Sequence, residues 1–366
     1  MTFFKKSYEG LWKSIIRPKR EIYDLGDLGP AEFTIENRRY QRNDIILYNQ
    51  RNMKLVCSLF EPIPEQRIEK RLPCVIFLHG NCSSRLEGIN TLHTLLPLNI
   101  TVFCFDMSGS GLSDGEYVTL GWYERDDVAC VIDYLRSTEK VSYIGLWGRS
   151  MGAVTALMHG HRDPSIAAMV IDSPFSSMSV LLKEIAKDYT RVPGFLVSLA
   201  KGCVKKTIRK KANFNLFELE PIKHVDKCFI PALFVAANQD ELIKPHHSER
   251  LHDKYAGEKS LIIVDGDHNS DRPQYALDSI GIFFYNTLQC ENSWMISHEE
   301  ERKMSDNLLI PMQEDFQSTS VSELRLLESQ SFSLYYPKLT EEEQKKFDEE
   351  NQRLMQNLGY LNTNSV

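Results

Sequence analysis

The sequence predicts an α/β fold, in which a mostly parallel central sheet carries helices on both faces. Short apolar runs alternate with helical segments along most of the chain, which is typical of parallel strands joined by right-handed helical crossovers. Residues 74–78 are apolar throughout, as expected for a central strand that is buried on both faces. Parallel sheets of this kind place their functional sites at the carboxyl ends of the strands.

The composition is that of an ordinary globular protein. The 366 residues are 42% hydrophobic and 25% charged, which fits one large domain with appendages or two domains. The formal net charge of -7 argues against a nucleic-acid partner, because no basic excess is available to neutralise phosphates. No apolar stretch approaches the roughly 20 residues that cross a bilayer, and no secretory signal is visible. The eight cysteines contain no C-x-x-C pair, which favours free thiols in a reducing, cytoplasmic setting.

Residues 1–30 form an N-terminal segment with its own character. Apolar residues at helical spacing are mixed with lysine and arginine up to Pro18, which predicts a basic amphipathic helix. The apolar stripe of such a helix either packs on the rest of the protein or lies on an anionic membrane surface. We favour packing on the domain, and peripheral membrane contact through residues 1–20 is the alternative.

Residues 31–289 are expected to form the main domain. Residues 32–60 have the pattern of an antiparallel hairpin with a turn at residues 49–52. The predicted strands that follow cover residues 74–78, 101–105, 143–147, 168–171, 232–236 and 260–264. The predicted helices cover residues 86–96, 122–136, 152–159, 246–255 and 275–288.

Two regions depart from this alternation. Residues 174–225 are helical and rich in lysine and arginine, so we expect a helical cap, inserted between two core strands and lying over the site. From residue 290 to residue 366 the chain is polar and serine-rich, which predicts a partly disordered tail. A capping box at residues 340–343 predicts a charged helix over residues 340–358 within this tail.

The pattern G-x-S-x-G, with Ser150 at its centre, is the motif around which the chain is organised. It lies between an apolar run that ends at Trp147 and a helical stretch of small residues. A nucleophile elbow needs this context, because its serine sits on a strained strand-to-helix turn. Gly148 and Gly152 leave room for the turn, since glycine has no Cβ. We therefore predict that Ser150 is a nucleophile.

A nucleophilic serine needs a base that is held in place by a third group. After a nucleophile elbow, the acid and the histidine follow in the chain order Ser, Asp, His. Asp240 follows the predicted strand 232–236, and His268 follows the predicted strand 260–264. We predict that His268 is the general base and then the general acid, and that Asp240 orients it.

Other acids and histidines have simpler explanations. The alternative role for Asp240 itself is an Asx-type turn or a helix cap. Asp265 and Asp267 share the loop of His268 and are badly placed to reach its ring. Four histidines lie on predicted helices, away from strand ends, and most of them are expected at the surface: His159, His161, His246 and His247.

The oxyanion formed by serine attack needs backbone N–H donors. Met151, directly after the nucleophile, is expected to supply one, and Asn81, after the strand 74–78, the other. Gly80 lets that loop approach the site, and His79 is expected to brace the loop rather than act as a second base. The sequence has no metal-ligand spacing, phosphate-cradling loop or dinucleotide fingerprint, so no metal is expected.

Several motifs together carry a family resemblance: Leu78-His79-Gly80-Asn81, Asp106-x-x-Gly109-x-Gly111-x-Ser113, the elbow, Asp240 and His268. Over residues 40–288 the chain resembles the α/β-hydrolase superfamily. Within it, the chain looks like the serine aminopeptidase-like and BEM46-like branch, which includes monoacylglycerol lipases and protein depalmitoylases. The resemblance implies an α/β-hydrolase fold and hydrolysis through an acyl-enzyme intermediate, without a cofactor, on peptides, esters or thioesters.

The cap bears on the choice of substrate. Its basic excess beside the apolar residues 195–200 suits an acyl chain with an anionic head, and the alternative is a solvated helix face. We therefore expect a serine hydrolase for a small, acylated, lipid-like substrate, with the basic cap as a second place of peripheral membrane contact. The alternatives are an aminopeptidase-like peptide hydrolase and a non-catalytic binding or scaffold protein on a hydrolase fold. The sequence does not determine the oligomeric state.

Overall fold

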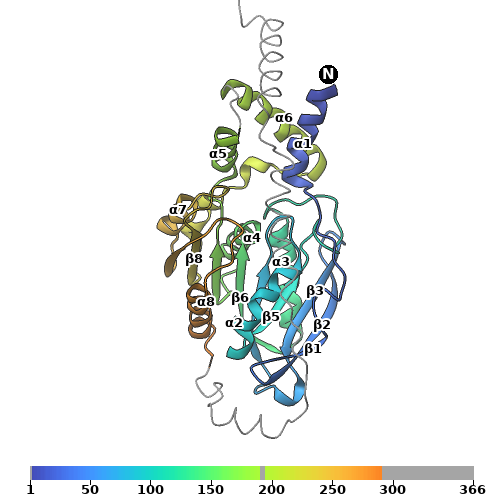
Figure 1. The fold of residues 1–366 in the computed structure, drawn as a ribbon, viewed down its shortest axis with the longest axis vertical. Helices are drawn as coiled ribbons and strands as arrows, with labels where there is room; N and C mark the ends of the chain where they lie inside the picture. Colours follow the sequence, from blue (N-terminus) through green and yellow to red (C-terminus); the bar gives the residue numbers. More distant parts are fainter. Residues whose placement is uncertain (1, 190–193, 291–366) are drawn as a thin grey trace, which may run out of the picture.

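A mixed sheet forms the body of the protein in the computed structural model, which describes residues 2–189 and 194–290 (Figure 1). The nine strands of this described sheet lie in the order β1-β2-β3-β5-β4-β6-β7-β8-β9. Three strands form the antiparallel side: β1 (Glu32–Ile35), β2 (Arg38–Tyr48) and β3 (Lys54–Pro62). The parallel strands are β4 (Leu72–Leu78), β5 (Thr101–Phe105), β6 (Val141–Arg149), β7 (Ala168–Asp172), β8 (Ala232–Ala237) and β9 (Lys259–Val264). The predicted α/β fold with a mostly parallel sheet is confirmed.

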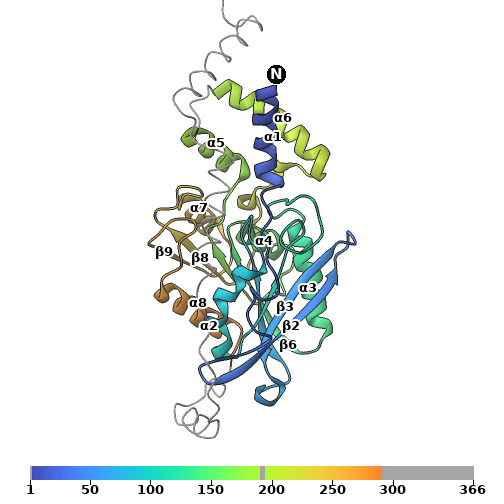
Figure 2. The same cartoon turned by 45° about the vertical axis from the view of Figure 1, so that its right-hand side comes forward.

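Helices cover both faces of the sheet (Figures 1 and 2). On one face lie α3 (Glu124–Ser137) and α4 (Met151–Gly160), and on the other lie α2 (Leu92–Leu95) and α8 (Gln274–Thr287). The alternation of side chains along β4 serves the two cores, because Ile76 packs with the first group of helices and Phe77 with the second. This explains why residues 74–78 are apolar without interruption.

Two helices are inserted between β7 and β8. They are α5 (Met178–Tyr189) and α6 (Gly194–Ala212), and they stand at one end of the sheet in both views (Figures 1 and 2). Only residues 173–177 separate the end of β7 from α5, so this insertion lies at the carboxyl end of the parallel strands. The role of residues 174–225 as a cap over the site stays a prediction.

The N-terminal helix α1 (Thr2–Ile16) packs against α6. Trp12 and Ile16 are buried, the Lys211 ammonium lies 4.6 Å from the centre of the Trp12 ring, and Val118 N–H donates to Ile16 O. The segment after this helix is tied down as well, because Arg20 donates to Ser113 O at 2.9 Å. None of the helices in the described ranges combines the length and the apolar character needed to span a bilayer.

Two local features differ from the predictions. In place of a single helix over residues 86–96 the chain forms 3-10 turns at Arg85–Thr91 and Leu96–Leu98, with one α-helical turn between them. Gly88 packs so closely that a Cβ there would lie 2.2 Å from Cys104 Sγ, and Pro97, which has no N–H, limits the helix at its other end. The second difference is an additional hairpin, since the predicted turn at residues 49–52 joins β2 to β3 while β1 and β2 are joined by a turn at Glu36 and Asn37, both at positive φ.

Of the remaining predicted features, one can be compared with the structure and two lie outside the described residues. The helix α7 (His246–Lys254) agrees with the predicted helix 246–255. The predicted tail, with its helix over residues 340–358, lies outside the described residues, as do the side chains of residues 195–200.

Candidate active site

Ser150 lies at the sharp turn between β6 and α4. Its φ of 53° and ψ of -113° are strained for a residue with a side chain, as a nucleophile elbow requires. The glycines on either side make the turn sterically feasible. A Cβ on Gly148 would lie 2.2 Å from the carbonyl oxygen of Gly152, and one on Gly152 would lie 1.9 Å from that of Leu78.

The side chains of Ser150, His268 and Asp240 form one hydrogen-bonded chain. His268 Nε2 lies 3.0 Å from Ser150 Oγ, and His268 Nδ1 lies 2.6 Å from Asp240 Oδ2. All three side chains are largely buried. With Asp240 ionised, the ring donates its Nδ1–H to the carboxylate and leaves Nε2 to accept the serine proton. Ser150 and His268, which are 118 positions apart in the sequence, thus meet with Asp240 at the carboxyl ends of β6, β8 and β9.

Asp240 also stabilises a turn, which is the alternative role that its sequence context suggests. Its second oxygen, Oδ1, accepts the N–H groups of Leu242 at 3.0 Å and Ile243 at 2.7 Å. One carboxylate oxygen therefore fixes the loop and the other faces His268. The neighbouring acids are engaged elsewhere, because Asp265 accepts from Asn238 Nδ2 and Asp267 accepts from backbone N–H groups of its own loop.

The predicted oxyanion donors lie at two adjacent chain segments. Met151 is the first residue of α4, where the N–H has no intrahelical acceptor and the helix end favours negative charge. The contact of Gly152 with the carbonyl oxygens of Leu78 and His79 places the loop after β4 against this helix end. Asn81 belongs to that loop, and its Oδ1 is buried with no partner among the described residues. The oxyanion role of the two N–H groups stays a prediction.

His79 joins two loops beside the site. It is completely buried, its Nδ1 lies 2.7 Å from Gly80 O, and its Nε2 accepts the N–H of Met107 at 3.1 Å. Because a backbone N–H can only donate, the ring proton is on Nδ1 and points at the Gly80 carbonyl. Both nitrogens are therefore occupied by the backbone, which leaves His79 no free nitrogen to act as a base.

Comparisons with known proteins agree with this fold. Residues 69–211 match the family model described as "Serine aminopeptidase, S33", and residues 145–322 match that of the "PhoPQ-activated pathogenicity-related protein". The α/β hydrolase domain-containing protein WAV2 of Arabidopsis thaliana is 26% identical over 223 residues, which cover 58% of this chain and 66% of that protein. The esterase Pf2001 of Pyrococcus furiosus has the same fold, with a TM-score of 0.55 at 21% identity over 74% of this chain and 99% of that chain. The chain belongs to the α/β-hydrolase superfamily.

A further relative of this α/β-hydrolase has no assigned activity. The uncharacterized protein YqkD of Bacillus subtilis is 30% identical over 199 residues, which cover 53% of this chain and 64% of that protein. The match thus spans less than two thirds of the length of that relative. The comparisons fix the superfamily of the hydrolase and leave its substrate to be proposed.

A buried ion pair that the sequence does not reveal lies beside the candidate site. Arg272 Nη2 lies 2.8 Å from Asp172 Oδ1 and Arg272 Nε lies 2.9 Å from Asp172 Oδ2. Burial by itself would raise the pKa of Asp172, but the facing guanidinium outweighs it and holds the pKa below its usual value. Asp172 also accepts the N–H of Ser150 on its main-chain oxygen at 2.8 Å, and Arg272 donates to Ser270 O at 3.1 Å. The pair thus connects the elbow with the loop of His268.

The Asp106 motif of the family resemblance has a structural role here. Its carboxylate accepts the hydroxyl of Tyr23 and the N–H groups of Arg85 and Leu112, all at 2.7–2.8 Å. Gly111, at a φ of +44°, passes so close that a Cβ would lie 2.3 Å from this carboxylate. Asp106 therefore holds the loop after β5 and the segment after α1 together. It has no contact with the Ser150 hydroxyl among the described interactions.

The prediction that the helical histidines lie at the surface is wrong for two of them. His159 and His247 are buried, while His161 and His246 are half-buried. The signal for this was the helical face on which they lie, since His159 follows Thr155 and Ala156 on the inner face of α4. Burial lowers the pKa of His247 to about 4, and burial together with a neighbouring imidazole lowers that of His161 to about 4.

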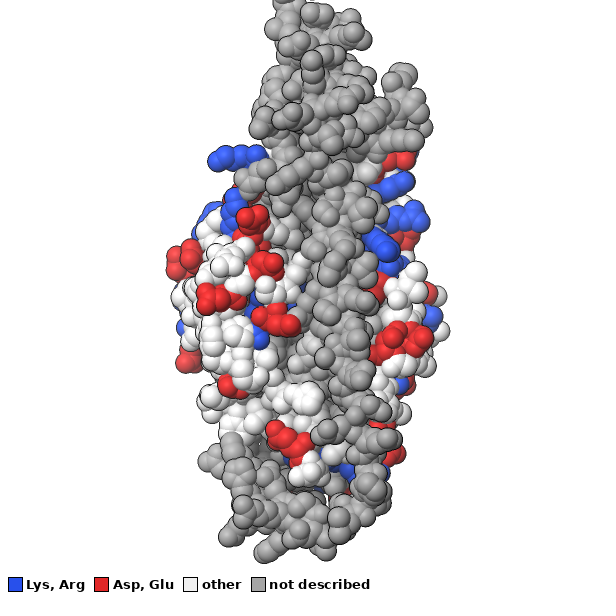
Figure 3. All heavy atoms as spheres, viewed as in Figure 1, with Lys and Arg blue, Asp and Glu red and all other residues white. Residues whose placement is uncertain are grey.

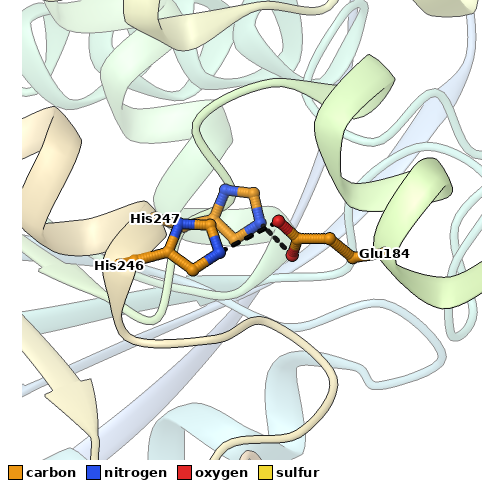
Figure 4. A group of neighbouring side chains, drawn as sticks. All are labelled: Glu184, His246 and His247. Carbon is orange, nitrogen blue, oxygen red and sulfur yellow. Dashed lines mark hydrogen bonds and ion pairs between the residues drawn. The ribbon is translucent and has the colours of Figure 1, made fainter. Parts of the chain in front are cut away.

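The carboxylate of Glu184 on α5 faces the stacked imidazole rings of His246 and His247 (Figure 4). His246 Nε2 is 3.0 Å from one oxygen and His247 Nε2 is 3.2 Å from the other, and the ligand atoms are close enough to hold a metal ion. However, Ser176 N–H donates to His247 Nδ1 at 3.1 Å, so the proton of the neutral His247 ring is on Nε2 and points at Glu184. The arrangement fits a carboxylate that links α5 to α7 better than it fits a metal site.

Proposed function

We propose that this α/β-hydrolase is a serine hydrolase that cleaves a carboxylic ester, thioester or amide through an acyl-enzyme intermediate. The observation that carries the proposal is the hydrogen-bonded chain from Ser150 Oγ to His268 Nε2 and from His268 Nδ1 to Asp240 Oδ2. A serine hydroxyl becomes a strong nucleophile when a neutral imidazole takes its proton. The strained elbow and the first N–H groups of α4 beside it support the same chemistry.

The reaction follows from these positions. Ser150 Oγ attacks the carbonyl carbon while His268 takes the hydroxyl proton, and the oxyanion lies against the N–H groups of Met151 and Asn81. The bond to the leaving group then breaks, and His268 gives its proton to that group. Water next attacks the acyl-enzyme and gives a proton to His268, which returns it to Ser150 Oγ as the acid leaves. Asp240 stabilises the imidazolium in both halves of the reaction.

We further propose that the substrate joins a lipid-like acyl chain to an anionic head. The second half of α6 supports the anionic head, because the basic side chains on this helix are exposed: Lys205, Lys206, Arg209, Lys210 and Lys211. Lysine and arginine side chains are visible on both sides of the molecule at the level of the cap (Figure 3). Cationic groups around a site raise the local concentration of anionic substrates. Acyl-CoA and lysophospholipids have this combination of chain and charge.

A peptide substrate is the second candidate, and the match of residues 69–211 to a serine aminopeptidase family favours it. The same Ser150 chemistry cleaves an amide, with the amine as the leaving group that His268 protonates. An aminopeptidase also has to recognise a free α-ammonium group. The cationic exposed face of α6 disfavours such a substrate, because like charges repel.

Labelling with a fluorophosphonate probe tests the proposal directly. The wild-type protein should be labelled, and Ser150→Ala and His268→Ala should not be. A folded wild type without labelling would contradict the serine mechanism and favour a non-catalytic binding protein. Turnover of p-nitrophenyl esters of increasing chain length, acyl-CoAs and aminoacyl p-nitroanilides then separates the candidates. A preference for the anilides would support the aminopeptidase.

The charge of the cap can be tested with a matched pair of substrates. Changing Lys205 and Lys206 to glutamine should lower kcat/KM for an acyl-CoA several-fold and leave that for a neutral p-nitrophenyl ester of equal chain length unchanged. Added salt should lower the acyl-CoA value of the wild type toward that of the variant, because salt screens exposed charges. Equal effects on both substrates would contradict a role for the charge.

A further inference from the structure

Arg149 belongs to the elbow itself, directly before Ser150, and its side chain is only 12% exposed. Its Nη2 donates to the carbonyl oxygen of His268 at 2.8 Å and to that of Ser270 at 3.2 Å. The residue next to the nucleophile therefore holds the main chain of the base.

The other side of the Arg149 guanidinium faces a carboxylate. Its Nη1 lies 3.5 Å from Oε1 of Glu87, whose side chain is also 12% exposed. The second oxygen of Glu87, Oε2, accepts the N–H of Gly80 at 2.8 Å. Gly80 precedes Asn81, so Glu87 orients the peptide that leads to the predicted oxyanion donor. The contacts form one path from the Asn81 loop through Glu87 and Arg149 to His268.

The chemistry of this pair suits positioning better than simple stabilisation. Removing two charges from water costs about as much as their attraction returns, so a buried ion pair adds little stability compared with apolar packing. The pair instead fixes the orientation of the main-chain groups that it contacts. The planar guanidinium presents donors at fixed angles, and here it donates to two carbonyl oxygens while its charge faces a carboxylate.

We propose that Arg149 and Glu87 are a positioning pair, which holds the His268 loop and the Asn81 loop in the geometry that acyl transfer at Ser150 needs. The inference rests on the proposed function and adds to it two residues that touch neither the substrate nor the reacting atoms. The bond of Arg149 to His268 O limits movement of the ring toward or away from Ser150 Oγ. The bond of Glu87 to Gly80 N–H holds the His79–Gly80 peptide, and thereby the start of the adjoining peptide that carries the Asn81 N–H.

Steady-state kinetics with p-nitrophenyl butyrate test the pair. In Arg149→Met and Glu87→Gln, kcat should fall about 10- to 100-fold, as expected for displacements approaching 1 Å, while KM changes less than threefold. The amide oxygen introduced by Glu87→Gln can still accept from Gly80 N–H, so this variant isolates the ion pair. The double variant should be no slower than Arg149→Met alone, because both changes break the same path. Arg149→Lys should restore only part of kcat, since an ammonium cannot reach all three acceptors.

Arg67→Met is the matched control. Arg67 is 14% exposed and pairs with Glu61 at 2.6 Å, before β4 and therefore at the opposite end of the parallel strands from the site. This variant should show a comparable shift in thermal unfolding and an unchanged kcat. If Arg149→Met does not fold, Arg149→Lys and Glu87→Gln carry the test.

The possible results separate the inference from the function on which it rests. A wild type that does not react with the fluorophosphonate probe would overturn both. A reactive wild type whose Arg149 and Glu87 variants keep kcat within twofold would overturn the inference alone. A fall in kcat equal to that of Arg67→Met, or a change in KM only, would also overturn it. Selective loss of kcat, with a slower labelling rate of Ser150 in both variants, would support it.

Discussion

Gly152 is the point of closest contact between the elbow and the central strand, and its replacement by alanine tests the site. The added Cβ would lie 1.9 Å from Leu78 O and 2.9 Å from His79 O. Both are main-chain atoms at the end of β4, which is hydrogen-bonded to β5 on one side and to β6 on the other. Neither atom can rotate away as a side chain can, so the start of α4 has to move.

The size of that movement follows from the contact distance. Ordinary contact with a Cβ begins at 3.4 Å, so the start of α4 moves by about 1.5 Å, which is the difference between 3.4 Å and 1.9 Å. This displacement carries Ser150 Oγ and Met151 N–H away from His268 and from the Asn81 loop. A misplacement of about 1 Å costs on the order of 100-fold in rate, and overpacking costs about 1–3 kcal/mol in free energy of unfolding.

Two measurements on Gly152→Ala check this reasoning. The value of kcat with an activated ester should fall about 100-fold, and chemical denaturation should show a loss of about 1–3 kcal/mol. Gly202→Ala in α6 is the control, because a Cβ there meets nothing within 4 Å. This control should keep kcat and gain up to about 1 kcal/mol, since alanine favours a helix over glycine. A Gly152→Ala protein with wild-type kcat and stability would refute the close contact.

Three further predictions concern the buried acids and histidines. Asp240→Asn should lower kcat by on the order of 10³- to 10⁴-fold. Its loss of stability should be small, because the amide oxygen still accepts the backbone N–H groups of the turn. A mild loss of kcat would contradict the role of Asp240 toward His268. Asp172→Asn should lower the free energy of unfolding by about 3–5 kcal/mol, because it leaves the Arg272 charge buried without its partner. Since the folded-state pKa of Asp172 is lowered, its contribution is complete above about pH 4 and is lost as the pH falls below that value, as urea denaturation at pH 7 and pH 3 would show. The pKa of His247 is lowered to about 4 by burial first and by His246 and Arg250 next, against the opposing effect of the Glu184 carboxylate. As the pH falls, the imidazole is therefore protonated in the unfolded chain before it is protonated in the folded protein. The free energy of unfolding should accordingly fall between about pH 6.5 and pH 4. His247→Gln should flatten that slope, and an unchanged slope would contradict the assignment.

The parallel part of the fold could be predicted because each of its signals is local. A short apolar run that ends in glycine or in polar residues shows a buried strand and its carboxyl end within a few neighbouring positions. The predicted strand 143–147 lies inside β6 (Val141–Arg149), and the predicted strand 168–171 lies inside β7 (Ala168–Asp172). The same locality allowed Ser150, Asp240 and His268 to be singled out, since each follows a strand.

Other features had no local signal. The turn at Glu36 and Asn37 places both residues at positive φ, although the pair lacks the glycine that usually marks such a turn. The turns at Arg85–Thr91 contain Gly88, which packs closely against Cys104 on a strand elsewhere in the sequence. The burial of His247 depends on Ser176 and Glu184 from the cap. Each of these follows from tertiary packing.

The difference between the residues that react and those that position them has a physical origin. The chemistry requires given residue types at given places, so a serine between two glycines after a strand is informative by itself. The residues that position them need only pair opposite charges or donate to main-chain carbonyl oxygens, and many pairs of residues can do this. Arg149 therefore looks like a neutral choice within G-x-S-x-G until the structure places its side chain between Glu87 and His268 O. The side chain of Arg149 starts at the elbow and extends toward the loops that carry His268 and Asn81. An arginine side chain is long enough to contact both loops. Its removal should lower kcat more than it changes KM.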